Sequence, residues 1–176
     1  MRRLFFLPLL AALVLAAGCG GDGDDESSAQ AWADDFCSAS ADWRTSLEDI
    51  VGQFQSPSDL DVDSVQAAVD DGLDATESFV NEVDELGAPE TEAGQEAAGI
   101  VDSMTSSIQT TADELRSTFE GIDSLQDLIA QAGPAASQVG QLEQELQSSV
   151  DELENLDTGE LGSELESNED CAAAKS

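Results

Sequence analysis

Apolar residues recur every three or four positions through almost the whole chain after Ser28, and this spacing limits the folds open to it. Such a period places apolar side chains along one stripe of an α-helix. No stretch alternates apolar and polar residues as a half-buried strand does, and runs of β-branched residues are absent. The sequence therefore predicts an all-α fold. The first helical stripe contains Trp32, Phe36, Ala39, Trp43, Leu47, Ile50 and Phe54.

Glycine and proline mark where the first two predicted helices end. Pro57 ends the first helix, because proline disfavours helical geometry in the residue before it. The second predicted helix covers 62–86, and its apolar stripe is made mainly of valine and leucine. Gly87, which tolerates left-handed backbone, and Pro89 end it.

The third predicted helix covers 90–129, and its length favours a kink or break near Gly121. Gly133 and Pro134 are expected to end it, with Pro134 in the first turn of a fourth helix that continues to Leu156. Short connections between long amphipathic helices favour antiparallel neighbours. We therefore expect an antiparallel up-and-down bundle of three to four long helices.

Residues 1–18 have the features of a lipoprotein signal peptide. Arg2 and Arg3 precede an apolar run over 4–17, which is shorter than the roughly twenty residues of a membrane-spanning helix. The general secretory route is favoured over the twin-arginine route. The run ends in a sequence that resembles a relaxed bacterial lipobox: Leu15, Ala16, Ala17, Gly18 and Cys19.

We accordingly predict lipidation of Cys19, the alternative being an ordinary cleaved signal followed by a chance cysteine. Residues 19–28 would be the lipidated cysteine and a flexible acidic tether, and 29–176 the helical bundle domain with a C-terminal cysteine tail. No other segment approaches transmembrane length. The expected location is the extracytoplasmic face of the cell membrane, with two or three acyl chains giving durable attachment.

Lipid on Cys19 would leave Cys37 and Cys171 as an even pair in an oxidising compartment, where disulfides persist. We predict that they are bonded, the alternative being two free thiols. A short segment containing Leu161 and Leu165 is expected to pack toward the core and place Cys171 beside the bundle.

The chain is extremely acidic. Loss of Arg2 and Arg3 with the signal peptide leaves three basic residues against 39 acidic ones, a formal charge of −36. Such a surface repels nucleic acids and anionic headgroups, so we expect no nucleic-acid partner. The acidity either favours cationic partners or is a solubility or high-salt adaptation that implies no partner.

Asp59, Asp61, Asp63 and Asp70 have the spacing of an EF-hand calcium loop. Ser64 stands where the loop needs glycine, and Asp70 is shorter than the usual bidentate glutamate. The four residues are therefore weak metal candidates. The alternative interpretation, which we favour, is that the acids cap and charge-complement the second helix.

Catalysis has few candidate side chains. The chain lacks histidine and tyrosine, and after signal cleavage its single lysine is Lys175, one residue from the end. Carboxylate pairs on a polar helix face are solvated rather than tuned for acid–base chemistry. We therefore predict a non-enzymatic protein with no cofactor.

Two functions remain. In the first, a membrane-anchored module binds an envelope protein or peptide through its helical faces. In the second, the bundle binds a small ligand, either an apolar molecule between helices or calcium at 59–70. Trp32 and Trp43 could line a ligand slot, although core packing is the commoner use at helical spacing. A closed interior would favour the first function, and an apolar cavity of several hundred Å³ beside the tryptophans the second.

Several short stretches of the sequence are distinctive: Trp32 to Cys37 with Trp43 and Leu47, Leu86 to Thr91, Gly94 to Ala97, and Cys171. In these stretches the chain resembles a group of small lipoproteins and secreted proteins of actinobacterial envelopes, for which no activity is established. The resemblance implies a helical bundle with paired cysteines at its ends. The strongly acidic surface departs from the more balanced members of that group.

Overall fold

The computed structural model describes residues 28–53, 61–156 and 159–175, without the side chains of Gln53 and Ala132. These ranges contain helices and their connections and no strand, so the all-α prediction is confirmed. The helices are α1 (Ser28–Gln53), α2 (Val62–Leu86), α3 (Gly94–Phe119), α4 (Leu125–Glu154), α5 (Glu160–Ser167) and α6 (Glu169–Ala174).

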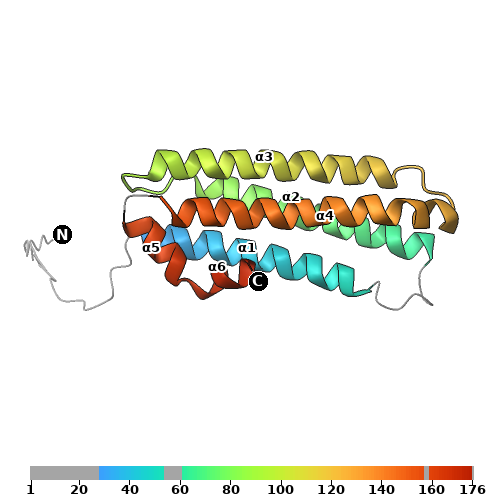
Figure 1. Ribbon diagram of the computed structural model, residues 1–176, viewed down its shortest axis with the longest axis horizontal. Coiled ribbons are helices and arrows are strands. Elements are labelled where there is room, and N and C mark those ends of the chain that lie inside the picture. The colour runs from blue at the N-terminus through green and yellow to red at the C-terminus, as the bar shows by residue number, and fades with distance from the viewer. Residues whose placement is uncertain (1–27, 54–60, 157–158, 176) are drawn as a thin grey trace, which may run out of the picture.

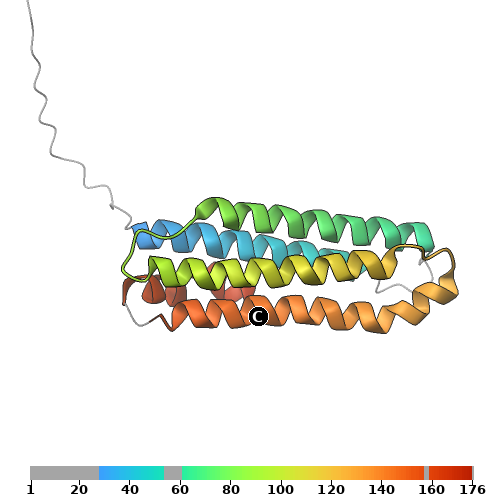
Figure 2. The same cartoon turned by 90° about the horizontal axis from the view of Figure 1, so that it is seen from above.

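Four long helices, α1 to α4, lie side by side with alternating direction and form the predicted up-and-down bundle (Figures 1 and 2). Each packs closely against the next along the chain: α1 against α2, α2 against α3, and α3 against α4. The short helices α5 and α6 pack against both α1 and α4 and so cover the remaining side. They cover only part of it, because the C-terminus lies near the middle of the bundle's length (Figure 1).

Local signals explain most helix ends. The Asp61 side chain accepts a hydrogen bond from the Ser64 backbone N–H at 2.8 Å and caps the start of α2. Gly87 takes a positive φ of 63° directly after α2, and Gly121 takes a positive φ of 85° two residues after the end of α3. The second predicted helix is therefore correct, and so is the break near Gly121.

The predicted helix boundary at Gly133 and Pro134 is wrong, because Pro134 lies inside α4. The fourth helix instead begins after Ser124, whose hydroxyl oxygen accepts a hydrogen bond from the Asp127 backbone N–H at 3.2 Å. A proline removes one helical hydrogen bond and crowds the preceding turn, which bends a helix rather than ending it when packing holds both halves. The first turns of α4 are tilted relative to the rest (Figure 2). Leu128 in this tilted part packs with Val65 and Ile122.

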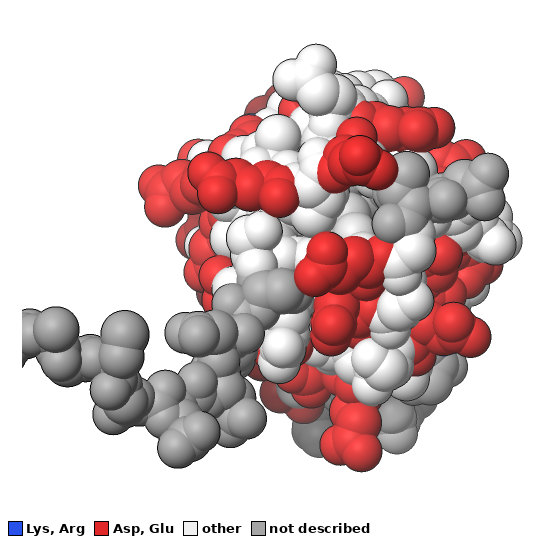
Figure 3. Space-filling view, turned by 90° about the vertical axis from the view of Figure 1, so that its left-hand side faces the viewer, with Lys and Arg blue, Asp and Glu red and all other residues white. Residues whose placement is uncertain are grey.

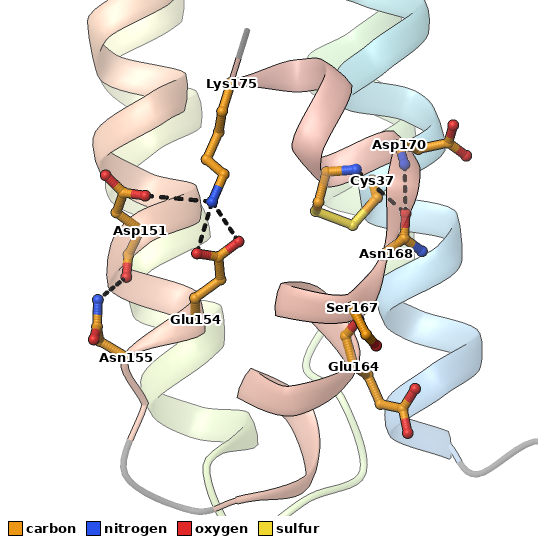
Figure 4. A network of polar contacts seen from close by, with 10 residues as sticks. Cys37, Asp151, Glu154, Asn155, Glu164, Ser167, Asn168, Asp170 and Lys175 are labelled. Carbon is orange, nitrogen blue, oxygen red and sulfur yellow. Dashed lines mark hydrogen bonds and ion pairs between the residues drawn. A yellow bond between two sulfur atoms is a disulfide. The ribbon is translucent and has the colours of Figure 1, made fainter.

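The C-terminal segment is held to the bundle by covalent and polar contacts. Cys37 of α1 and Cys171 of α6 form the predicted disulfide, with their Cα atoms 4.6 Å apart, and both residues are buried. The Asn168 side chain accepts hydrogen bonds from the backbone N–H groups of Asp170 and Cys171 (Figure 4). It also donates a hydrogen bond to Asp34 of α1 at 2.6 Å. These contacts cap α6 and hold it against α1.

Lys175 closes the segment onto α4. Its Nζ atom lies 2.6 and 2.7 Å from the two carboxylate oxygens of Glu154 and 3.6 Å from Asp151 (Figure 4). The hydrogen bond with Glu154 raises the pKa of Lys175. Leu161 and Leu165 are buried in the core, as predicted. The tail is therefore a structural part of the bundle.

Candidate ligand-binding cavity

A cavity of about 400 Å³ lies between the four long helices, in the half of the bundle that α5 and α6 do not cover. It is bounded by the last turns of α1, the first half of α2, the last turns of α3 and the first half of α4. Its lining residues are Leu47, Ile50, Val51, Val65, Ala68, Val69, Gly72, Leu73, Thr76, Ala112, Leu115, Phe119, Leu125, Leu128, Ile129, Ala135, Ala136, Val139 and Leu142.

The helix arrangement explains why this space is unfilled. The Ala173 carbonyl of α6 accepts a hydrogen bond from Arg44 Nη1 at 2.9 Å, and Ala174 lies near Leu47 and Leu146. Beyond this level α1 continues to Gln53 without α6 beside it. On α4, the residues that follow the Pro134 bend are the small side chains of Ala135 and Ala136. Aliphatic side chains therefore surround a space that nothing in the described chain fills.

The cavity wall is almost wholly apolar. Thr76 is the one lining residue with a polar side chain, and its hydroxyl donates a hydrogen bond to the Gly72 carbonyl at 2.7 Å. The same oxygen accepts a hydrogen bond from Trp43 Nε1 at 3.1 Å, so its single donor and one of its two acceptor lone pairs are used. None of the lining residues in the described part of the chain is titratable. This wall can hold hydrocarbon, and it offers no acid, base or nucleophile for a reaction.

One side of the cavity reaches the surface through exposed apolar side chains. Val51 on α1 is 51% exposed, and Leu125 and Ile129 on α4 are 50% and 69% exposed. In the described part of the chain, these three are the large hydrophobic residues that are exposed, and all three line this cavity. Exposed apolar groups gathered at one opening are typical of a binding site rather than of scattered surface residues. We define these three residues as the mouth of the cavity.

Both tryptophans are packing residues rather than the walls of a slot. Trp32 stacks on Phe36 with ring centroids 5.2 Å apart, and its Nε1 donates to the Gly87 carbonyl at 2.9 Å. Trp43 stacks on Phe79 at 4.6 Å and is 3% exposed. The cavity begins one helical turn beyond Trp43, at Leu47, and Trp32 does not line it. Neither tryptophan lines the cavity, and Trp43 adjoins it only through its hydrogen bond to Thr76.

The structure does not bring the weak metal candidates together. Asp59 lies outside the described residues, and Asp61 is occupied as the cap of α2. Hydrogen bonds from Ser64, first from its backbone N–H, hold the pKa of Asp61 below its usual value. Asp63 and Asp70 both lie in helix α2, seven residues and therefore about 10 Å apart along its axis. Among the residues described, no group of three acidic, cysteine or histidine side chains could hold a metal ion.

Cys19, the predicted lipidation site, lies outside the described residues. Within the ranges the structure covers, every helix is too short or too polar to cross a membrane. Comparison with known proteins identifies no relatives: no family matches the sequence, and no curated protein or solved structure gives a significant match.

Proposed function

We propose that this protein is a lipid-anchored, extracytoplasmic carrier that holds an apolar small molecule between the helices of its bundle. The observation that carries the proposal is the cavity of about 400 Å³, whose lining has a single polar side chain, already hydrogen-bonded. Small-molecule sites in proteins are commonly concave, mostly apolar and about 300 to 1,000 Å³ in volume. The cavity meets all three conditions.

The cavity volume favours a small ligand over a peptide. An aliphatic cavity of about 150 Å³ binds benzene, so about 400 Å³ suits a molecule two to three times larger, such as a medium-length alkyl chain. An α-helix is about 10 Å across with its side chains, so one turn of it would need roughly the whole volume. An envelope protein docking on the outer helix faces is the second candidate function, although no described surface feature singles out such a partner.

The predicted anchor supports an action at a membrane, where apolar molecules are found. Lipid on Cys19 would hold the bundle by the start of α1, and the cavity lies at the opposite end of that helix. The end from which α1 starts is covered by acidic side chains, and no basic side chain is visible among the described residues of that face (Figure 3). Repulsion from anionic headgroups would keep this end off the membrane surface. The cavity would then face away from the protein's own membrane.

In this proposed role the protein binds its ligand and catalyses no reaction. Among the described residues, the cavity wall contains no titratable side chain, and the chain contains neither histidine nor tyrosine. Cys37 and Cys171 are joined in the disulfide and do not supply a thiol nucleophile. The chemistry that remains is reversible binding, driven by removal of apolar ligand surface from water.

The two parts of the proposal are tested with one variant. Wild-type protein made in a lipoprotein-processing bacterium is expected to partition into the detergent phase, and Cys19→Ser into the aqueous phase, because only the wild type would carry acyl chains. Purified Cys19→Ser protein is expected to bind decanol saturably with a stoichiometry of one. Identical aqueous partitioning of both forms would contradict the anchor, and absence of saturable decanol binding would contradict the carrier function.

A further inference from the structure

We infer that the ligand is a single-chain amphiphile without negative charge, with its alkyl chain in the cavity and a neutral or cationic headgroup at the mouth. This inference rests on the proposed function and adds the chemical class of the ligand. It follows from the absence of a polar partner in the described cavity wall and from the charges around the mouth.

The cavity wall leaves no place for a headgroup inside. A polar group buried without a hydrogen-bond partner costs several kcal/mol, and a buried unpaired charge costs far more. Thr76 already donates to Gly72 and accepts from Trp43, so its hydroxyl could accept at most one further hydrogen bond, which is too little to replace the hydration of a headgroup. Any headgroup must therefore remain in water at the mouth, beside Val51, Leu125 and Ile129, while the chain enters the bundle.

Acidic residues lie close in sequence to lining residues on each helix around this end of the bundle. Asp49 precedes Ile50 on α1, Glu120 follows Phe119 of α3, and Asp127 precedes Leu128 on α4. We define the rim as the following acids at this end, each of which lies within four residues in sequence of a lining residue. The rim consists of Glu48, Asp49, Asp61, Asp63, Asp113, Glu120, Asp123 and Asp127.

The basic residues near this end do not neutralise the rim. Arg116 of α3 lies 3.6 Å from Asp113, and both side chains are largely exposed. Arg44 of α1 is bound to Glu48 at 2.9 Å and to the Ala173 carbonyl at 2.9 Å. Lys175, the remaining basic residue of the described chain, pairs with Glu154 near the other end of α4. The rim therefore keeps a large excess of negative charge.

A headgroup at the mouth would lie within roughly a Debye length of several rim carboxylates, about 8 to 10 Å at physiological salt. A carboxylate or phosphate headgroup would be repelled there, a quaternary ammonium attracted, and a hydroxyl nearly unaffected. The cavity alone would accept the chain of any of these amphiphiles. Selection by charge at the rim would thus exclude fatty-acid anions and anionic lipids and retain neutral and cationic ones.

The inference is tested with three probes that share one chain length: decyltrimethylammonium, decanol and decanoate, each below its micelle concentration. Purified full-length Cys19→Ser protein is titrated with each at pH 8, where decanoate is ionised. At about 20 mM salt we expect decanoate to bind at least about tenfold more weakly than decyltrimethylammonium, and decanol to bind with an affinity between the two. At about 1 M salt we expect the difference in affinity between decanoate and decyltrimethylammonium to fall to about twofold. Decanoate binding as tightly as the cationic probe at low salt would overturn the inference.

A matched pair of variants locates the effect. Asp49→Asn with Glu120→Gln removes two exposed rim charges, and Asp35→Asn with Glu166→Gln removes two exposed charges away from the cavity. The first pair is expected to reduce the ratio of the dissociation constants of decanoate and decyltrimethylammonium about threefold or more. The second pair is expected to leave this ratio nearly unchanged. Equal narrowing by both pairs would contradict the role of the rim.

Two other results can be distinguished from a change in charge selectivity. If none of the three probes binds, the proposed carrier function fails, whatever the charge of the rim. If light scattering shows a dimer that decanol dissociates, a second copy of the chain occupies the mouth, and the inference of an amphiphile is overturned. A monomer that binds the probes in the order stated supports it.

Discussion

Loss of the disulfide between Cys37 and Cys171 is expected to lower the free energy of unfolding by about 4 to 5 kcal/mol in the chain-entropy model. The bridge joins residues 134 positions apart, so it restricts the unfolded chain strongly. It also fixes α6 to α1, where Cys37 and Cys171 are both buried. Urea denaturation of Cys19→Ser protein, with and without reductant, measures the change and avoids the third thiol.

The matched control is the double variant Cys37→Ala with Cys171→Ala. It should have the stability of the reduced protein and should not respond to reductant. Because α5 and α6 cover one side of the bundle, the backbone amides of these two helices should become the least protected against hydrogen exchange, both in the reduced protein and in the double variant. An unchanged denaturation midpoint on reduction would contradict the structural role of the bridge.

Truncation of Phe79 to alanine is expected to cost about 3 to 5 kcal/mol. Its ring is 2% exposed and stacks on Trp43 with centroids 4.6 Å apart, so the substitution removes contacts and leaves a void in the core. Equilibrium denaturation followed by tryptophan fluorescence measures the loss, because Trp43 reports directly on this contact.

Phe79→Leu is the control for size, and we expect it to lose less than half as much stability, because leucine fills more of the space than alanine. The pair also separates packing from binding. If the ring of Phe79 belonged to a ligand slot, its truncation would weaken decanol binding with little cost in stability. A loss below about 1 kcal/mol for Phe79→Ala would contradict the packing role.

Helix periodicity and local stop signals predict much of this fold. The limits of α2, the reversal near Gly121 and the disulfide all follow from residues whose effect is local or combinatorial: a cap, a glycine in the left-handed region and an even pair of cysteines. The error at Pro134 has the opposite cause. Proline is a local helix breaker, but α4 packs against α3 along its length, and this tertiary contact overrides the local preference.

The cavity was expected only as one of two alternatives, and the sequence did not predict where it lies. Periodicity shows which side chains face inward, but not whether the space between them is filled. That depends on where α6 ends relative to α1, which is set by the bond to Cys37 and the contact between Arg44 and Ala173. The small residues Ala68 on α2 and Ala135 on α4, both buried in the cavity wall, are the signal in the sequence that could have indicated it.

The most direct test of the carrier function fills the cavity and measures decanol binding. Ala68→Leu with Ala135→Leu places larger side chains at two buried lining positions, and Ala31→Leu with Ala172→Leu makes the same changes at exposed positions away from it. The filled variant should melt no lower than wild type and bind decanol at least about tenfold more weakly, whereas the control should bind as wild type does. Equal decanol affinity in the filled variant and the wild type would contradict the proposed function.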